Sequence, residues 1–170
     1  MQRRSLLKLG FASAATLAIV GGGVAVFYVP AWRGGRLTEA GRGVLGGVAR
    51  AVLDGSLPTE GGARSAAVAA HLDRMNTTLR AMPPATQREV GDLLALLASP
   101  PGRLALAGLA SEWRLAEVAQ TQAALQAMRT SRLSLRRQAY HALRDLTHAA
   151  YFASSGTWEQ LGYHGPVNLD

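Results

Sequence analysis

RLSLRRQAYHALRDLTHAAYFA, residues 132–153, is the longest helical pattern in the chain. Apolar residues recur in it every three or four positions, which places them on one side of a helix. They are Leu133, Tyr140, Leu143, Leu146, Ala150 and Tyr151. The opposite side carries a basic stripe made of Arg137, His141, Arg144 and His148. A helix with one apolar side needs other helices to cover it, so the stretch predicts a helical bundle.

Shorter helical patterns precede this stretch. Thr38 is the predicted N-cap of the first, which ends near Leu53, and Glu39 favours its first turn. Its interior glycines each weaken it by ~1 kcal/mol relative to alanine, so we expect packing to hold it. The other helices are expected at about 62–81, from a Thr86–Glu89 capping box onward, at 104–109 and at 111–128.

No segment alternates apolar and polar residues at the spacing of a strand. We therefore predict an all-α fold, an irregular bundle of five to six helices. It would follow an N-terminal signal or anchor helix and end in an extended aromatic tail. Residues 1–31 would be the leader, and residues 32–170 a single domain.

The leader begins with a cationic segment and continues without charge from Leu9 to Val29. This layout is typical of an export signal, and paired arginines indicate the twin-arginine route, which carries folded proteins. The residues that resemble its motif are Arg3, Arg4, Leu6, Leu7 and Lys8. A Sec signal or a plain anchor is the alternative. The weak site Val29-Pro30-Ala31 leaves cleavage before Trp32 and retention as a membrane anchor both open, since the run is also long enough to span a bilayer.

Composition narrows the classes of function. The chain has no cysteine, so it holds neither an iron–sulfur cluster nor a covalently attached c-type haem. Its hydrophobic fraction of 48% is mostly alanine, leucine and valine, which favour helices. The net charge of +7 falls to about +4 without the leader, and no basic run is interleaved with aromatic residues. Nucleic acid is therefore not an expected partner.

Motifs for chemistry are missing from the sequence. It has no Gly-x-Gly-x-x-Gly after a strand, no Gly-x-Ser-x-Gly and no Cys–His pair. None of the four histidines has the spacing of a common metal motif. His141 and His148 could share a ligand, but we interpret them as solvated. We predict no catalytic, cofactor-binding or metal-binding residue in this chain, and an enzyme is the least favoured hypothesis.

The C-terminal segment leaves the helical pattern. It reads Trp158-Glu-Gln-Leu-Gly-Tyr163-His-Gly165-Pro166, after an arginine-rich helix ending in Ala-Tyr-Phe. This combination resembles the gluconate 2-dehydrogenase subunit 3 family. Three further segments look like landmarks of that family, so that the resemblance spans about residues 36–167. These landmarks are Leu37-Thr38-Glu39, Leu53 to Pro58, and Trp113-Arg114.

The resemblance implies a non-catalytic small subunit of a glucose–methanol–choline-type dehydrogenase. The chain itself would bind no cofactor, FAD would sit in the large flavoprotein subunit, and a cytochrome c subunit could complete the complex. The small subunit would carry its partner to the periplasm through the twin-arginine translocase, and an uncleaved leader would hold it in the inner membrane. The rival hypothesis is a stand-alone, membrane-anchored periplasmic protein with a structural or ligand-binding role.

Two segments are candidate partner-binding surfaces. One is the tail, with Trp158, Tyr163, Gly165 and Pro166, since tryptophan and tyrosine are enriched at interface hot spots. The tail could equally cap the domain's own core. The other is the basic stripe with Arg137 and Arg144, for which a solvated helix face is the alternative.

Overall fold

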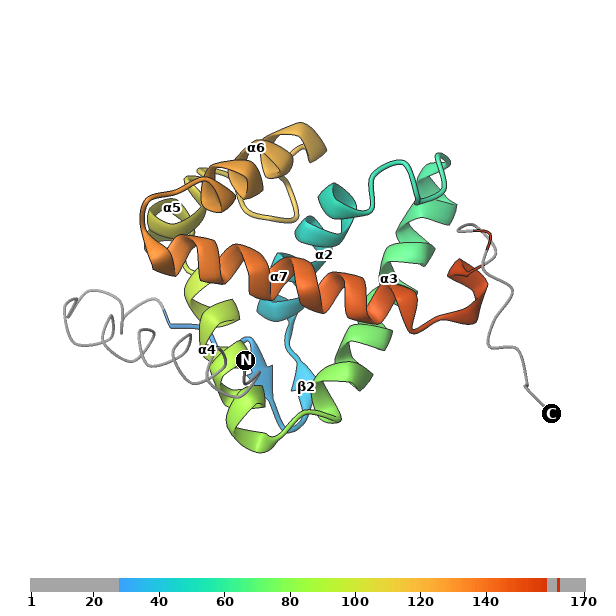
Figure 1. Ribbon diagram of the computed structural model, residues 1–170, viewed down its shortest axis with the longest axis horizontal. Helices are drawn as coiled ribbons and strands as arrows, with labels where there is room; N and C mark the ends of the chain where they lie inside the picture. The colour runs from blue at the N-terminus through green and yellow to red at the C-terminus, as the bar shows by residue number, and fades with distance from the viewer. Residues whose placement is uncertain (1–27, 159–161, 163–170) are drawn as a thin grey trace.

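The computed structural model describes residues 28–158 and Gly162. Within them the predicted all-α bundle is confirmed (Figure 1). Its helices are α2 (Glu39–Val52), α3 (Gly61–Arg80), α4 (Pro84–Ala98), α5 (Pro100–Ala107), α6 (Val118–Arg129) and α7 (Ser134–Phe152), followed by a single 3₁₀ turn, η2 (Ser155–Thr157). Of the predicted leader, residues 1–27 lie outside the described part.

α2 is the central helix and contacts α3, α4, α6 and α7. It begins as the sequence predicts, because the Thr38 hydroxyl accepts a hydrogen bond from the amide of Gly41 at 3.4 Å. Two of its glycines, Gly41 and Gly47, lie where the backbone of another segment approaches closely. A Cβ on Gly47 would lie 2.5 Å from the carbonyl oxygen of Trp113, a contact that only glycine permits. Packing therefore holds this helix, as predicted.

α7 crosses α2 and also packs on α3 and α6 (Figure 1). The apolar side predicted for it is buried at Leu143, Leu146, Ala150 and Tyr151. Leu133 is the exception, with 64% of it exposed, because it precedes the first turn of α7 and does not share the helix's packed side. The largest fully buried side chains come from α2, α3, α4, α6 and α7, and include Leu45, Met75, Leu94, Leu97, Met128 and Leu143.

A two-stranded β-hairpin precedes α2, so the prediction of no strand was wrong. β1 (Trp32–Arg33) pairs antiparallel with β2 (Arg36–Leu37). Gly34 and Gly35 form the turn with φ of 58° and 72°, and two positive φ values in succession are the requirement of a tight hairpin turn. Strands of two residues are too short to show alternation in the sequence.

The segment 111–117 is a loop, not the start of a helix, so the helix predicted over 111–128 begins too early. α6 starts only at Val118, where the Gln120 side chain accepts from the backbone amide of Glu117 at 3.1 Å. Leu115, which the helical pattern over 111–128 would place on its apolar side, is 73% exposed. The reason is tertiary, since the carbonyl groups of Trp113 and Arg114 bind a side chain from α2 and do not continue a helix.

Prolines begin two helices earlier than predicted. α4 starts at Pro84, ahead of the expected Thr86–Glu89 capping box, and α5 starts at Pro100 instead of Leu104. A proline in the first turn loses no hydrogen bond, because the first amides of a helix have no partner within it. The Ser99 hydroxyl completes the start of α5 by accepting from Gly102 at 3.2 Å.

Candidate interaction surfaces

The loop at Trp113-Arg114, which carries one of the family-like landmarks, is fixed to α2 and α4. Arg50 of α2 donates from its Nη2 to the carbonyl oxygens of Trp113 and Arg114, both at 2.9 Å. The Trp113 side chain is buried, and its indole nitrogen donates to the carbonyl oxygen of Leu97 at 2.8 Å. Residues distant in sequence are thereby joined into one rigid corner of the bundle.

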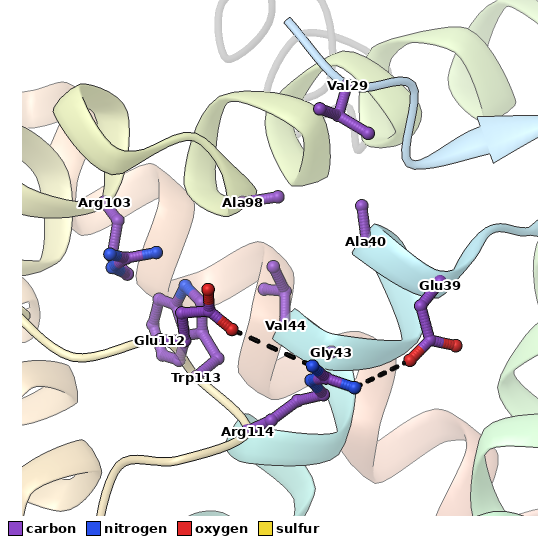
Figure 2. A pocket seen from close by; sticks show the side chains of 10 residues that line it. All are labelled: Val29, Glu39, Ala40, Gly43, Val44, Ala98, Arg103, Glu112, Trp113 and Arg114. Atoms are coloured by element: carbon purple, nitrogen blue, oxygen red, sulfur yellow. Dashed lines mark hydrogen bonds and ion pairs between the residues drawn. The ribbon is translucent and has the colours of Figure 1, made fainter. Parts of the chain in front are cut away.

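A pocket of about 200 Å³ lies beside this corner (Figure 2). Its walls are mostly apolar, from Val29, Ala40, Val44 and Ala98. Figure 2 shows the Arg114 guanidinium at the mouth, between two carboxylates. It pairs with Glu39 at 2.9 Å and more weakly with Glu112 at 3.9 Å. These groups are largely exposed, so the pairs contribute little to stability.

The two cations of this pocket already have hydrogen-bond or ion-pair partners within the chain. Arg114 has its two carboxylates, and the buried Arg103 donates to the carbonyl oxygens of Leu109 and Ala110 at 3.2 and 3.1 Å. Each cation has partners and no nucleophile lies beside a base among the lining residues. The pocket can accept a small apolar side chain, and its Arg114 landmark has a structural role.

The basic stripe of α7 is partly exposed, and its two arginines differ in their contacts. Arg137 donates to the carbonyl oxygens of Ser131 and Arg132 at 2.7 and 3.0 Å, which fastens the loop before α7. Arg144 only approaches Asp145, with the atoms 3.8 Å apart. Arg144 is therefore the freer cation of this stripe for a partner.

His141 is exposed, whereas His148 is half-buried. Burial, and then the positive charge of Arg144, lower the pKa of His148 below 6.5, while Asp145 opposes the shift. The His148 ring lies 5.8 Å, centroid to centroid, from that of Phe152, a side chain with 44% exposure. The C-terminal half of the stripe, together with Phe152, thus combines the cation of Arg144, the imidazole of His148 and an aromatic ring.

The tail was predicted to be extended, but its first residues, Ser155–Thr157, form the 3₁₀ turn η2. The Thr157 hydroxyl contacts the carbonyl oxygens of Tyr151 and Ser154 at 2.9 and 2.7 Å. Trp158 is half-buried, and its indole nitrogen donates to the carbonyl oxygen of Phe152 at 2.7 Å. Trp158 thus covers the end of α7. Tyr163, Gly165 and Pro166 lie outside the described residues.

The end of the predicted leader is part of the folded structure. Ala31 is buried, and its carbonyl oxygen accepts from the amide of Thr38 at 3.0 Å. The Thr38 hydroxyl donates to the carbonyl oxygen of Pro30 at 2.6 Å, and the Tyr28 hydroxyl to Asp92 at 3.0 Å. The predicted export residues Arg3, Arg4, Leu6, Leu7 and Lys8 lie outside the described residues.

One buried polar residue drew no functional prediction from the sequence. His71 is 1% exposed, and neither ring nitrogen has a hydrogen-bond partner. Its position on the apolar side of the α3 pattern was the available signal. A buried imidazole without partners is costly to charge, so we expect this residue to make the bundle less stable in acid.

Comparison of the chain with family models, with curated proteins and with solved structures found no match. In residues 28–158, no group of three or more histidine or carboxylate side chains is placed to hold a metal ion. None of the helices described is both long and apolar enough to cross a membrane.

Proposed function

We propose that this chain is the non-catalytic small subunit and export escort of an FAD-dependent dehydrogenase of the glucose–methanol–choline type. The large flavoprotein subunit would perform the oxidation and hold FAD. This chain would contribute the twin-arginine signal at Arg3 and Arg4 and a surface that binds the folded flavoprotein. The complex would work in the periplasm, attached to the inner membrane if the leader is retained.

The observation that carries the proposal is the meeting of landmarks that lie far apart in the sequence. Glu39, from the opening landmark, pairs with Arg114 at 2.9 Å, across 75 positions. Asp54, from the second landmark, pairs with Arg64 and lies 3.4 Å from the Gln122 amide of α6. Two of the landmarks thus meet at Glu39 and Arg114, and Asp54 joins a third to α3 and α6. Landmark residues that connect parts of the fold, and do not form a catalytic site, are what we expect of a chain whose role is to present a binding surface.

The proposal is tested by co-expressing the full chain with a glucose–methanol–choline-type flavoprotein from the same genome that has no export signal of its own. We expect FAD-containing partner in the periplasm with the parent chain. Replacing both Arg3 and Arg4 with lysine should leave it in the cytoplasm, because lysine keeps the charge but lacks the planar guanidinium. Gln2→Ala, outside the pair, is the matched control. A flavoprotein exported equally well without this chain would contradict the escort role and favour the stand-alone anchored protein.

A further inference from the structure

A groove with a volume of about 450 Å³ lies between α5, the loop after it and α6. We call it the α5–α6 groove. It is lined mainly by small side chains, and Arg136 of α7 completes its wall. The small residues are Ala107, Gly108, Ala110, Ala123, Ala124 and Ala127. Figure 1 shows α5, α6 and the beginning of α7 gathered at one end of the molecule. Because the lining side chains are short, the backbone of a bound segment can approach α6 closely.

Arg136 is held in place by a single hydrogen bond. Its Nε donates to the carbonyl oxygen of Leu106 at 2.6 Å. Its two terminal nitrogens make no hydrogen bond or ion pair with a described residue, and Nη2 lies close to Gly108. A guanidinium fixed through Nε with its outer nitrogens unoccupied is prepared to bind a carboxylate.

The chain around the groove, residues 93–144, carries more arginines than carboxylates, since its only acidic residues are Glu112 and Glu117. No aspartate or glutamate occurs in residues 93–111 or 118–144, the two stretches that supply the lining. Arg129 and Arg132 join Arg136 at the junction of α6 and α7, and neither forms an ion pair with a described residue. This contrasts with the pocket at Arg114, where the carboxylates of Glu39 and Glu112 lie beside that cation. A partner can therefore supply the negative charge that this surface lacks.

Two exposed leucines accompany the groove. Leu104 is 59% exposed and lies one helical turn before Ala107 and Gly108 on α5. Leu133 is 64% exposed and precedes α7 as its N-cap residue, three positions before Arg136. Large apolar side chains beside an apolar hollow are typical of a protein-binding site.

We propose that the α5–α6 groove binds an acidic amphipathic segment of the flavoprotein partner. Apolar side chains of that segment lie in the groove and against Leu104 and Leu133, while its carboxylates pair with Arg136 and the neighbouring arginines. This inference rests on the proposed function and assigns the surface that performs it. The groove lies by the start of α7, and Trp158 follows the end of that helix. The groove and the tail are therefore separate surfaces, about 28 Å apart for a helix of 19 residues.

Charge and shape favour this occupant over the others. A second copy of this chain would bring a further excess of arginine to an already cationic surface. An anionic lipid surface would satisfy the arginines but needs no side-chain-sized hollow between two helices. Helix-in-groove recognition uses apolar anchors in the hollow and charged groups at its edge, as found here.

The test measures the Kd of the full chain, with its leader in detergent, for the FAD-loaded flavoprotein. Ala123 is exposed and lines the groove, so Ala123→Glu and Ala123→Lys introduce long side chains of opposite charge. We expect the glutamate to weaken binding about tenfold or more, and the lysine much less, because like charges across an interface repel. Ala66→Glu, at an exposed position of α3, should not change Kd. Leu104→Gln is a second variant that leaves the groove lining intact.

Cross-linking identifies the occupant. A photo-reactive amino acid in place of Leu104 should cross-link to a flavoprotein peptide that contains aspartate or glutamate, and the same group at His141 should not. Equal Kd values for the glutamate and lysine variants, or cross-links only from His141, would overturn the groove while the escort role stands. Cross-links between two copies of this chain would also overturn it. So would groove variants that lose binding to phosphatidylglycerol vesicles but still bind the flavoprotein. If no flavoprotein associates with the parent chain, the proposed function and this inference fail together.

Discussion

The ring of His71 in α3 lies edge-on to the ring of Tyr151 in α7, with their centroids 6.2 Å apart. Burial, and then the positive charge of Arg74, lower the pKa of His71 from 6.5 to about 4. Near neutral pH the imidazole is therefore uncharged, and it fills the contact between α3 and α7 as an apolar ring would. Protonation would place a charge in this contact with no hydrogen-bond partner for either nitrogen.

The first prediction follows from this pKa. The unfolded chain takes up a proton on His71 near pH 6.5 and the folded protein only near pH 4. The stabilisation is therefore complete above pH 6.5 and decreases as the pH falls through this window. By about pH 4 the free energy of unfolding should lose roughly 3 kcal/mol from this residue. Urea unfolding of the full chain across the window would measure the loss.

His71→Leu supplies the comparison for that experiment. It should unfold with a smaller pH dependence and keep its stability near neutral pH, because it removes two buried nitrogens without partners. His141→Gln, at an exposed position, should retain the dependence of the parent chain. An unchanged pH dependence in His71→Leu would disprove the role assigned to this histidine.

The second prediction concerns the close approach of Gly47 to Trp113. A Cβ at Gly47 would meet backbone, which cannot rotate away. Gly47→Ala should therefore reduce the free energy of unfolding by about 1–3 kcal/mol, the usual cost of overpacking. Gly62→Ala is the matched control, because a Cβ there meets nothing within 4 Å in α3, and it should stabilise by up to ~1 kcal/mol. Equal effects of the two changes in urea unfolding would contradict this account.

Local signals predicted much of the fold. The Thr38 N-cap and the buried side of α7 depend on neighbours within a few residues, so the local sequence pattern is enough to predict them. The loop at 111–117 depends on Arg50, more than 60 positions away, and its local pattern remains compatible with a helix. The hairpin has a local signal in Gly34-Gly35, but its strands of two residues each show no alternation beside it.

The candidate surfaces were harder to predict. The stripe of Arg137 and Arg144 lies on one helix and is visible as a spacing. The α5–α6 groove combines α5, α6 and Arg136 of α7, and its apolar residues are alanines that look alike in a sequence. Only the packing of the three helices brings them together.

The third prediction concerns processing of the leader. Cleavage after Ala31 would remove a buried residue and the carbonyl groups that bind Thr38. A protein exported in the folded state would hide this bond from a peptidase. We therefore expect the exported chain to retain residues 28–31, and intact-mass measurement of the periplasmic or membrane-bound protein would show it. A mature chain that begins at Trp32 would contradict the expectation.

The last prediction separates the two roles considered for the tail. The Trp158 indole nitrogen binds the carbonyl oxygen of Phe152 in the last turn of α7, where carbonyl groups lack partners within the helix. Trp158→Phe keeps a ring and removes the donor, so it should cost about 1 kcal/mol of unfolding free energy. Trp158→Ala also removes the packing and should cost more, with faster hydrogen exchange at the end of α7. Phe152→Ala, at a side chain 44% exposed, should change stability least. Retained stability in Trp158→Ala together with lost co-purification of the flavoprotein would show instead that Trp158 contacts the partner.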